Sequence, residues 1–216
     1  MRRIGLTLAL IGVGLWCAEH AVAQMGGGMR GGGGGGGGRP TPPEILPNTD
    51  RETMILSLPE DWYPSAPLTS ENKTDSYLFP RAQDHSNWTE TLRQEVFSST
   101  AGIASAERVY ELRSEINQEN CPAYTSKIRD DDPENGYPMI FWEQLCELSE
   151  DEAAASLHKV VLGNDRLYIL SKIWKYDPPG REWRRWRNYF EEVYVCDPTR
   201  PGHPCRPMLL PPRRGF

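Results

Sequence analysis

Residues 156–176 read SLHKVVLGNDRLYILSKIWKY, and the pattern in this stretch decides the fold. Side chains alternate in character before and after a Gly-Asn-Asp turn at residues 163–165. The alternating positions are His158, Val160, Leu162, Leu167, Ile169 and Ile173, with Tyr168, Leu170 and Trp174 on the opposite face. A period of two on both sides of such a turn is typical of paired antiparallel strands. The stretch therefore predicts a β-hairpin.

Two more strands are predicted just before this hairpin. Alternating residues at 124–128 form the first, and residues 139–146, MIFWEQLC, form the second. The sequence between them, DDDPENGYP at 130–138, contains proline and Asn-Gly, which are strong turn signals.

An earlier segment, NWTETLRQEVFS at residues 87–98, is ambiguous. Trp88, Leu92 and Val96 have the spacing of a helix, and Asn87 with Glu90 resembles a capping box. The threonines, valine and phenylalanine of the same segment suit a strand. We favour the strand.

Two helices complete the prediction. Residues 105–118, SAERVYELRSEINQ, carry an apolar stripe of Val109, Leu112 and Ile116, and residues 181–195, REWRRWRNYFEEVYV, follow a Pro-Pro-Gly break. The order is thus strand, helix, three or four strands, helix. Short connections between strands predict an α+β domain, an antiparallel meander sheet with both helices packed on one face.

The ends of the chain differ in composition from this domain. Residues 1–23 have two arginines, an apolar run too short to span a bilayer, and Ala-Val-Ala, which together predict a signal peptide. Glycine and proline dominate residues 24–60, which predicts a disordered tether. We expect a single α+β domain at 61–208 and a basic, proline-rich tail at 209–216. The exported protein is expected in the periplasm or outside the cell.

Four cysteines remain after the predicted cleavage, and an even number in an oxidising compartment predicts two disulfides. Four cysteines allow three pairings. The local pairing joins Cys121 to Cys146 and Cys196 to Cys205. The alternative at the second pair is a zinc site, with His203 and Asp197 as further ligands. We favour the disulfide because these residues lack the closely spaced ligand pairs of structural zinc sites.

The arginines of REWRRWR resemble a basic, aromatic patch for nucleic acid or lipid. At helical spacing the aromatic residues instead form one buried stripe, while Arg184, Arg185 and Arg187 project away from it. These three arginines are our candidate docking surface. The formal net charge of −6 argues against a general nucleic-acid binder.

Motifs with a catalytic mechanism are not evident, because the sequence has neither a G-x-S-x-G elbow nor an H-E-x-x-H helix. We therefore expect no catalytic, metal or cofactor site. The expected function is that of a non-enzymatic accessory or binding protein with a protein partner in the cell envelope and no membrane span. Two alternatives stay open: a small secreted hydrolase with His85 or His158 as base, and a ligand carrier whose cleft is lined by Trp88, Trp142 and Trp174.

Overall fold

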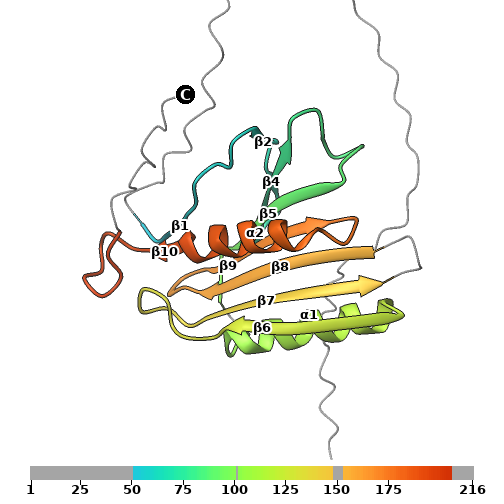
Figure 1. Ribbon diagram of the computed structural model, residues 1–216. Coiled ribbons are helices and arrows are strands. Elements are labelled where there is room, and N and C mark those ends of the chain that lie inside the picture. Colours follow the sequence, from blue (N-terminus) through green and yellow to red (C-terminus); the bar gives the residue numbers. More distant parts are fainter. Residues whose placement is uncertain (1–50, 101, 148–152, 206–216) are drawn as a thin grey trace, which may run out of the picture. The chain divides into compact units, whose positions relative to one another are not determined.

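A computed structural model describes residues 51–100, 102–147 and 153–205. The predicted signal peptide, most of the predicted tether and the predicted tail lie outside the described residues. Within them, the α+β prediction is confirmed: an antiparallel sheet of eight strands carries two helices (Figure 1).

The sheet has the strand order β2-β4-β5-β9-β8-β7-β6, and β3 pairs with β4. Its strands are β2 (Trp62–Pro64), β3 (Leu68–Thr69), β4 (Lys73–Pro80), β5 (Glu90–Phe97), β6 (Ala123–Asp130), β7 (Met139–Glu147), β8 (Ala153–Leu162) and β9 (Leu167–Trp174). The predicted hairpin is β8–β9, whose turn is closed by the Gly163 amide donating to the Arg166 carbonyl over 2.9 Å. The meander prediction holds for β6 to β9, and the ambiguous segment at 87–98 is strand β5.

Helix α1 (Ala106–Asn120) begins where the Ser105 hydroxyl accepts a hydrogen bond from the Arg108 amide over 3.2 Å. Its buried side differs from the predicted stripe. Leu112 is exposed, whereas Arg113 turns toward the sheet and its guanidinium reaches the Glu95 carboxylate over 2.8 Å. The side of α1 that faces the sheet therefore contains Ala106, Val109 and Arg113.

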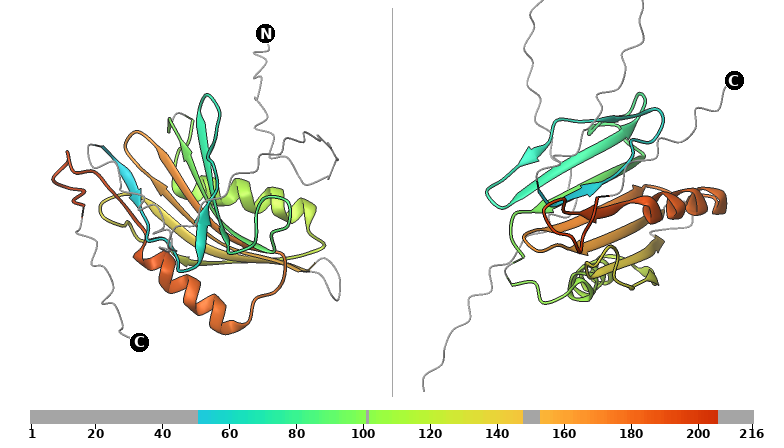
Figure 2. Two further views of the ribbon diagram at one scale, coloured as in Figure 1. Left: turned by 90° about the horizontal axis from the view of Figure 1, so that it is seen from above. Right: turned by 90° about the vertical axis from the view of Figure 1, so that its left-hand side faces the viewer.

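Helix α2 (Gly180–Glu192) lies on the opposite face of the sheet from α1, so the prediction that both helices share one face is wrong (Figure 2). Each face has its own apolar core. Trp186 and Phe190 of α2 pack with Leu170 and Trp174, while Val109 of α1 packs with the opposite side of β9 and its neighbours. The sheet can be covered twice because β9 is apolar on both faces.

A separate two-stranded pair joins the two ends of the described chain. Strand β1 (Thr53–Ile55) pairs with β10 (Tyr194–Cys196), and Met54 is buried in the α2-side core. The predicted tether therefore extends too far, because residues 53–55 are part of the fold. The predicted second helix also extends too far, since α2 ends at Glu192 and the buried Val193 and Val195 that follow favour extended backbone.

Both local cysteine pairs are disulfides in the structure. Cys121 is joined to Cys146 with a Cα–Cα distance of 5.7 Å, and Cys196 to Cys205 with 4.9 Å. The first ties the residue after α1 to β7, and the second closes the loop that follows β10. Neither helix in the described part of the chain is long and apolar enough to cross a membrane.

Candidate docking surface on helix α2

The inward face of α2 is fixed to the sheet by aromatic contacts. The helix starts after Pro179, whose carbonyl accepts a hydrogen bond from the Glu182 amide over 2.8 Å. The Trp186 ring meets the edge of Trp62 at a centroid distance of 5.0 Å, and Phe190 stacks with Phe141 at 5.5 Å. These rings are almost fully buried and determine how α2 is seated.

A buried lysine anchors the C-terminal end of α2. The Lys159 ammonium is 2% exposed and donates to the carbonyls of Phe190 and Val193, and it pairs with the Glu134 carboxylate at 2.7 Å. Burial lowers the pKa of Lys159, while the Glu134 charge acts in the opposite direction. A cation at the C-terminal end of a helix satisfies carbonyls that have no partner inside the helix.

A second buried lysine lies beneath the middle of α2. The Lys172 ammonium is 4.5 to 4.7 Å from the ring centroids of Trp62, Trp174 and Trp186, and 2.6 Å from the Glu90 carboxylate. Burial lowers the pKa of Lys172 to about 8, which Glu90 opposes. The sequence analysis missed this cluster, although Lys172 stands between Leu170 and Trp174 on one predicted face of the hairpin.

The outward face of α2 is basic in its N-terminal half, while Glu191 and Glu192 are exposed at its C-terminal end. Arg181, Arg184 and Arg185 are exposed, and none of the three forms an ion pair with another described residue. We call these three residues the arginine surface. Arg185 also lies over the Trp186 ring, with its guanidinium carbon 5.8 Å from the centroid.

The predicted docking residue Arg187 has a different role. Its side chain is half-buried and donates through Nε and Nη2 to the Glu143 carboxylate, over 3.0 and 2.6 Å. Arg129 of β6 binds the same carboxylate. The structure thus brings Arg184 and Arg185 together on the open face of α2, while Arg187 faces the sheet.

Grooves flank α2 on both sides. One, of about 470 Å³, is lined by Pro59, Arg185, Trp186, Asn188, Tyr189 and Glu192. The other, of about 380 Å³, lies between α2 and the β6–β7 edge of the sheet, where Trp183 and Arg187 face Lys127 and Leu145. The arginine surface therefore stands beside a groove of mixed polar and aromatic lining, of the size that can accept side chains of a partner.

The two candidate histidines occupy different environments. His158 is buried, and its ring nitrogens contact the hydroxyls of Ser171 and Ser156 at 2.8 and 2.9 Å. Burial lowers the pKa of His158 to about 3, so the ring is neutral near pH 7. His85 is exposed and contacts the Ser65 hydroxyl at 3.2 Å. Among the described residues no carboxylate hydrogen-bonds either ring, as the third group of a hydrolytic triad would.

The three tryptophans of the carrier alternative do not line one cleft, so that alternative is wrong. Trp142 is buried in the α1-side core, where it stacks on His158, and Trp174 is buried in the α2-side core. The sheet separates them, because the register places them on opposite faces. Trp88 is half-buried in another region, with the Lys175 ammonium 4.2 Å from its ring centroid.

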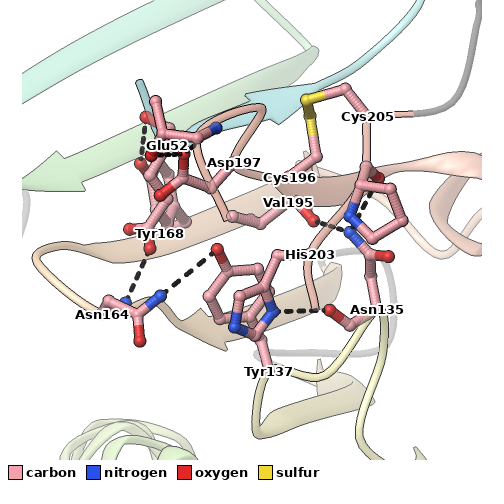
Figure 3. Close-up of a disulfide and its surroundings, with 12 residues drawn as sticks. Glu52, Asn135, Tyr137, Asn164, Tyr168, Val195, Cys196, Asp197, His203 and Cys205 are labelled. Carbon is pink, nitrogen blue, oxygen red and sulfur yellow. Dashed lines mark hydrogen bonds between the residues drawn. A yellow bond between two sulfur atoms is a disulfide. The ribbon is translucent and has the colours of Figure 1, made fainter. Parts of the chain in front are cut away.

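The Cys196–Cys205 disulfide closes the loop 196–205, and polar side chains of this loop bond to neighbouring groups (Figure 3). The buried Asp197 carboxylate accepts hydrogen bonds from the Thr199 amide and hydroxyl over 2.9 and 2.6 Å. The His203 ring stacks on Tyr137 at 4.0 Å, and its Nδ1 donates to the Asn135 carbonyl over 2.9 Å. These contacts hold the loop against the β6–β7 turn.

Comparisons with known proteins find little. The chain matches no family model and no curated protein. One similar solved structure is the solution structure of cyanobacterial PsbP (CyanoP) from Synechocystis sp. PCC 6803, with 10% identity and a TM-score of 0.44. The match covers 68% of this chain and 93% of that one.

Proposed function

We propose that this chain is a non-enzymatic accessory or binding protein of an exported assembly, and that its arginine surface docks an acidic segment of a protein partner. The observation that carries the proposal is the set of three exposed arginines that form no ion pair with another described residue, beside a groove on a firmly seated helix. Arginine pairs with carboxylates through two parallel hydrogen bonds, which gives such a surface a preference for acidic partners.

The three arginines of this surface stand at positions that are unfavourable for the stability of α2. Arg181 lies in the first turn of α2, where the helix dipole disfavours a cation. Arg184 and Arg185 follow it at positions i+3 and i+4, so both are its neighbours on the helix surface and repel it. Departures from local stability rules are expected at functional sites, where binding rather than folding accounts for the residue.

Export is part of the proposal and is supported by two features. The first 23 residues have the pattern of a signal peptide, and two disulfides fit an oxidising compartment. Whether that compartment is the periplasm or the exterior of the cell stays open. The chain as a whole has a net charge of −6, but the arginine surface is basic. An acidic partner in the same compartment would complement this surface.

The test is a cross-linked pull-down of the exported chain from its native envelope, with R184E and R184E/R185E as the variants. R108E is the control for the single variant R184E, because Arg108 is exposed on α1 at the opposite face of the sheet; it also breaks the ion pair of Arg108 with Glu111, so its folding is checked by circular dichroism. We expect a stoichiometric partner protein that is bound by the wild type and by R108E, weakened with R184E and lost with R184E/R185E. Equal capture by all four chains, capture of nucleic acid instead of protein, or recovery of the bare chain would contradict the proposal.

A further inference from the structure

Strand β6 is the last strand of the sheet and the edge strand on that side (Figure 1). It pairs with β7 from Ala123↔Glu147 to Ile128↔Trp142 in unbroken register, and a bulge interrupts the ladder only between Ile128 and Asp130. Within the described residues no strand pairs with the other side of β6. Its outer backbone groups therefore form a regular edge of about six residues that can accept another strand.

A covalent staple supports the extended backbone at this edge. The disulfide from Cys121 to Cys146 joins a residue two positions before β6 to the strand beside it, and Cys146 lies opposite Tyr124 in the register. An edge that is already held in the bound conformation has less conformational entropy to lose when a strand adds to it.

The α2-side face of this edge is positively charged. Lys127 is exposed, lies opposite Glu143 and forms no ion pair with another described residue. Glu143 is already bound by Arg129 and Arg187. Arg129 and Arg187 thus bind one carboxylate and Lys127 stands opposite it in the register, beside the 380 Å³ groove that also contains Asp177. Acidic side chains of an added strand would meet this charge.

The α1-side face of the same edge exposes one large apolar side chain beside the hydrogen-bonded Tyr124 and Ser126. Ile128 points to this face and is 42% exposed, which makes it one of the few exposed large apolar side chains among the described residues. Side chains alternate between faces along a strand, so a strand beside β6 would direct every second side chain over Ile128. An apolar side chain at that position would bury it.

We infer that β6 accepts an extended segment of a protein partner as an additional strand, one in which acidic and apolar side chains alternate. The acidic residues face Lys127 and the apolar residues cover Ile128. This site is separate from the arginine surface and does not depend on it. A second copy of the chain is a poorer occupant, because self-pairing of β6 would place Lys127 and Arg129 of both copies on the same face, where like charges repel.

The test uses a short labelled peptide of alternating Glu and Val residues, long enough to span β6, added to the exported chain. A peptide of the same composition with Glu and Val in separate blocks is the control. We expect the alternating peptide to bind more tightly than the block peptide and to slow amide hydrogen exchange between Ala123 and Ile128. Equal binding of both peptides, or protection elsewhere in the chain, would overturn the inference.

Three variants complete the test. Lys127→Glu should weaken binding of the alternating peptide by about two- to fivefold, the range expected for one exposed ion pair. Ile128→Ser should also weaken it, and both side chains are exposed, so folding is retained. R184E/R185E should bind the peptide as the wild type does. Loss of binding in R184E/R185E, or a dimer of the free chain that K127E strengthens, would contradict the assignment of β6 to a foreign strand.

Discussion

Glu52 and Gly163 are in such close contact that a Cβ atom on residue 163 would overlap the Glu52 carboxylate. The other oxygen of Glu52 accepts a hydrogen bond from the Asn164 amide over 2.7 Å (Figure 3). The residue just before β1 thus closes over the turn of the β8–β9 hairpin. The Arg166 carbonyl oxygen would also lie 2.8 Å from that Cβ, so glycine is required at 163 by these two close approaches and not by its backbone angles.

Gly163→Ala should lower the free energy of unfolding by about 1–3 kcal/mol, the usual effect of overpacking a filled site. Urea unfolding would measure it. In a Glu52→Ala background the same substitution should have a smaller effect, because the carboxylate is gone and only the close approach to the Arg166 carbonyl remains. If Gly163→Ala is equally damaging in both backgrounds, the contact with Glu52 is not the reason for the glycine.

The two disulfides should contribute unequally to stability. They close loops with sequence separations of 25 and 9 residues, and a longer loop restricts the unfolded chain more. We expect Cys121→Ser/Cys146→Ser to lower the unfolding free energy by about 3 kcal/mol, and Cys196→Ser/Cys205→Ser by somewhat less. Thermal unfolding of both double variants under non-reducing conditions measures the order. The reverse order would show that the contacts of the 196–205 loop outweigh loop closure.

Lys172 should make stability depend on pH in alkaline solution. Its pKa in the folded chain is about 8, below the value of about 10.4 in an unfolded chain. Between these values the unfolded chain binds more protons, so stability should rise as the pH increases from about 8 toward 10, by about 2 kcal/mol. The raised pKa values of the buried tyrosines act in the opposite direction only above about pH 10.

The comparison that isolates this effect is Lys172→Met combined with Glu90→Gln, which removes the buried pair without leaving an unpaired charge. Urea unfolding at several pH values should show the alkaline rise in the wild type and a flatter profile in the double variant. Identical profiles in the two chains would show that Lys172 does not titrate in this range.

Arg181→Glu should stabilise the isolated protein while it weakens partner capture. The change places an anion in the first turn of α2 and removes the repulsion with Arg184 and Arg185, together worth about 0.5–1 kcal/mol. Urea unfolding gives the first quantity, and the envelope pull-down gives the second. A variant that is more stable and still captures its partner would remove Arg181 from the docking surface, leaving Arg184 and Arg185 to be judged separately.

The parts of the fold that the sequence predicts are those with a local pattern. The β8–β9 hairpin and α1 have periodic side chains and a turn or cap within a few residues. The β1–β10 pair has neither, because two strands of three residues are brought together from positions about 140 residues apart. Because this pairing is not local, the sequence does not show that residues 53–55 and 194–196 are strands.

Charged residues at inward positions account for the other differences. Arg113 and Arg187 both bind carboxylates on distant strands, so neither the buried side of α1 nor the inward orientation of Arg187 can be inferred from helical spacing alone. The placement of α1 and α2 on opposite faces was in principle visible, since β9 has apolar residues at nearly every position. A strand exposed on one face would instead alternate with polar residues.

The sheet separates two apolar cores. Substitutions on its two faces should therefore have independent effects on the free energy of unfolding. Substitutions that are distant and share no partner usually add in free energy. Stabilising replacements on the α1 side could therefore be selected first and transferred unchanged into variants of the α2 side. A chain built in this way would allow the outer face of α2 to be randomised for new binding specificities, since its folding would be insulated from the sequence chosen there.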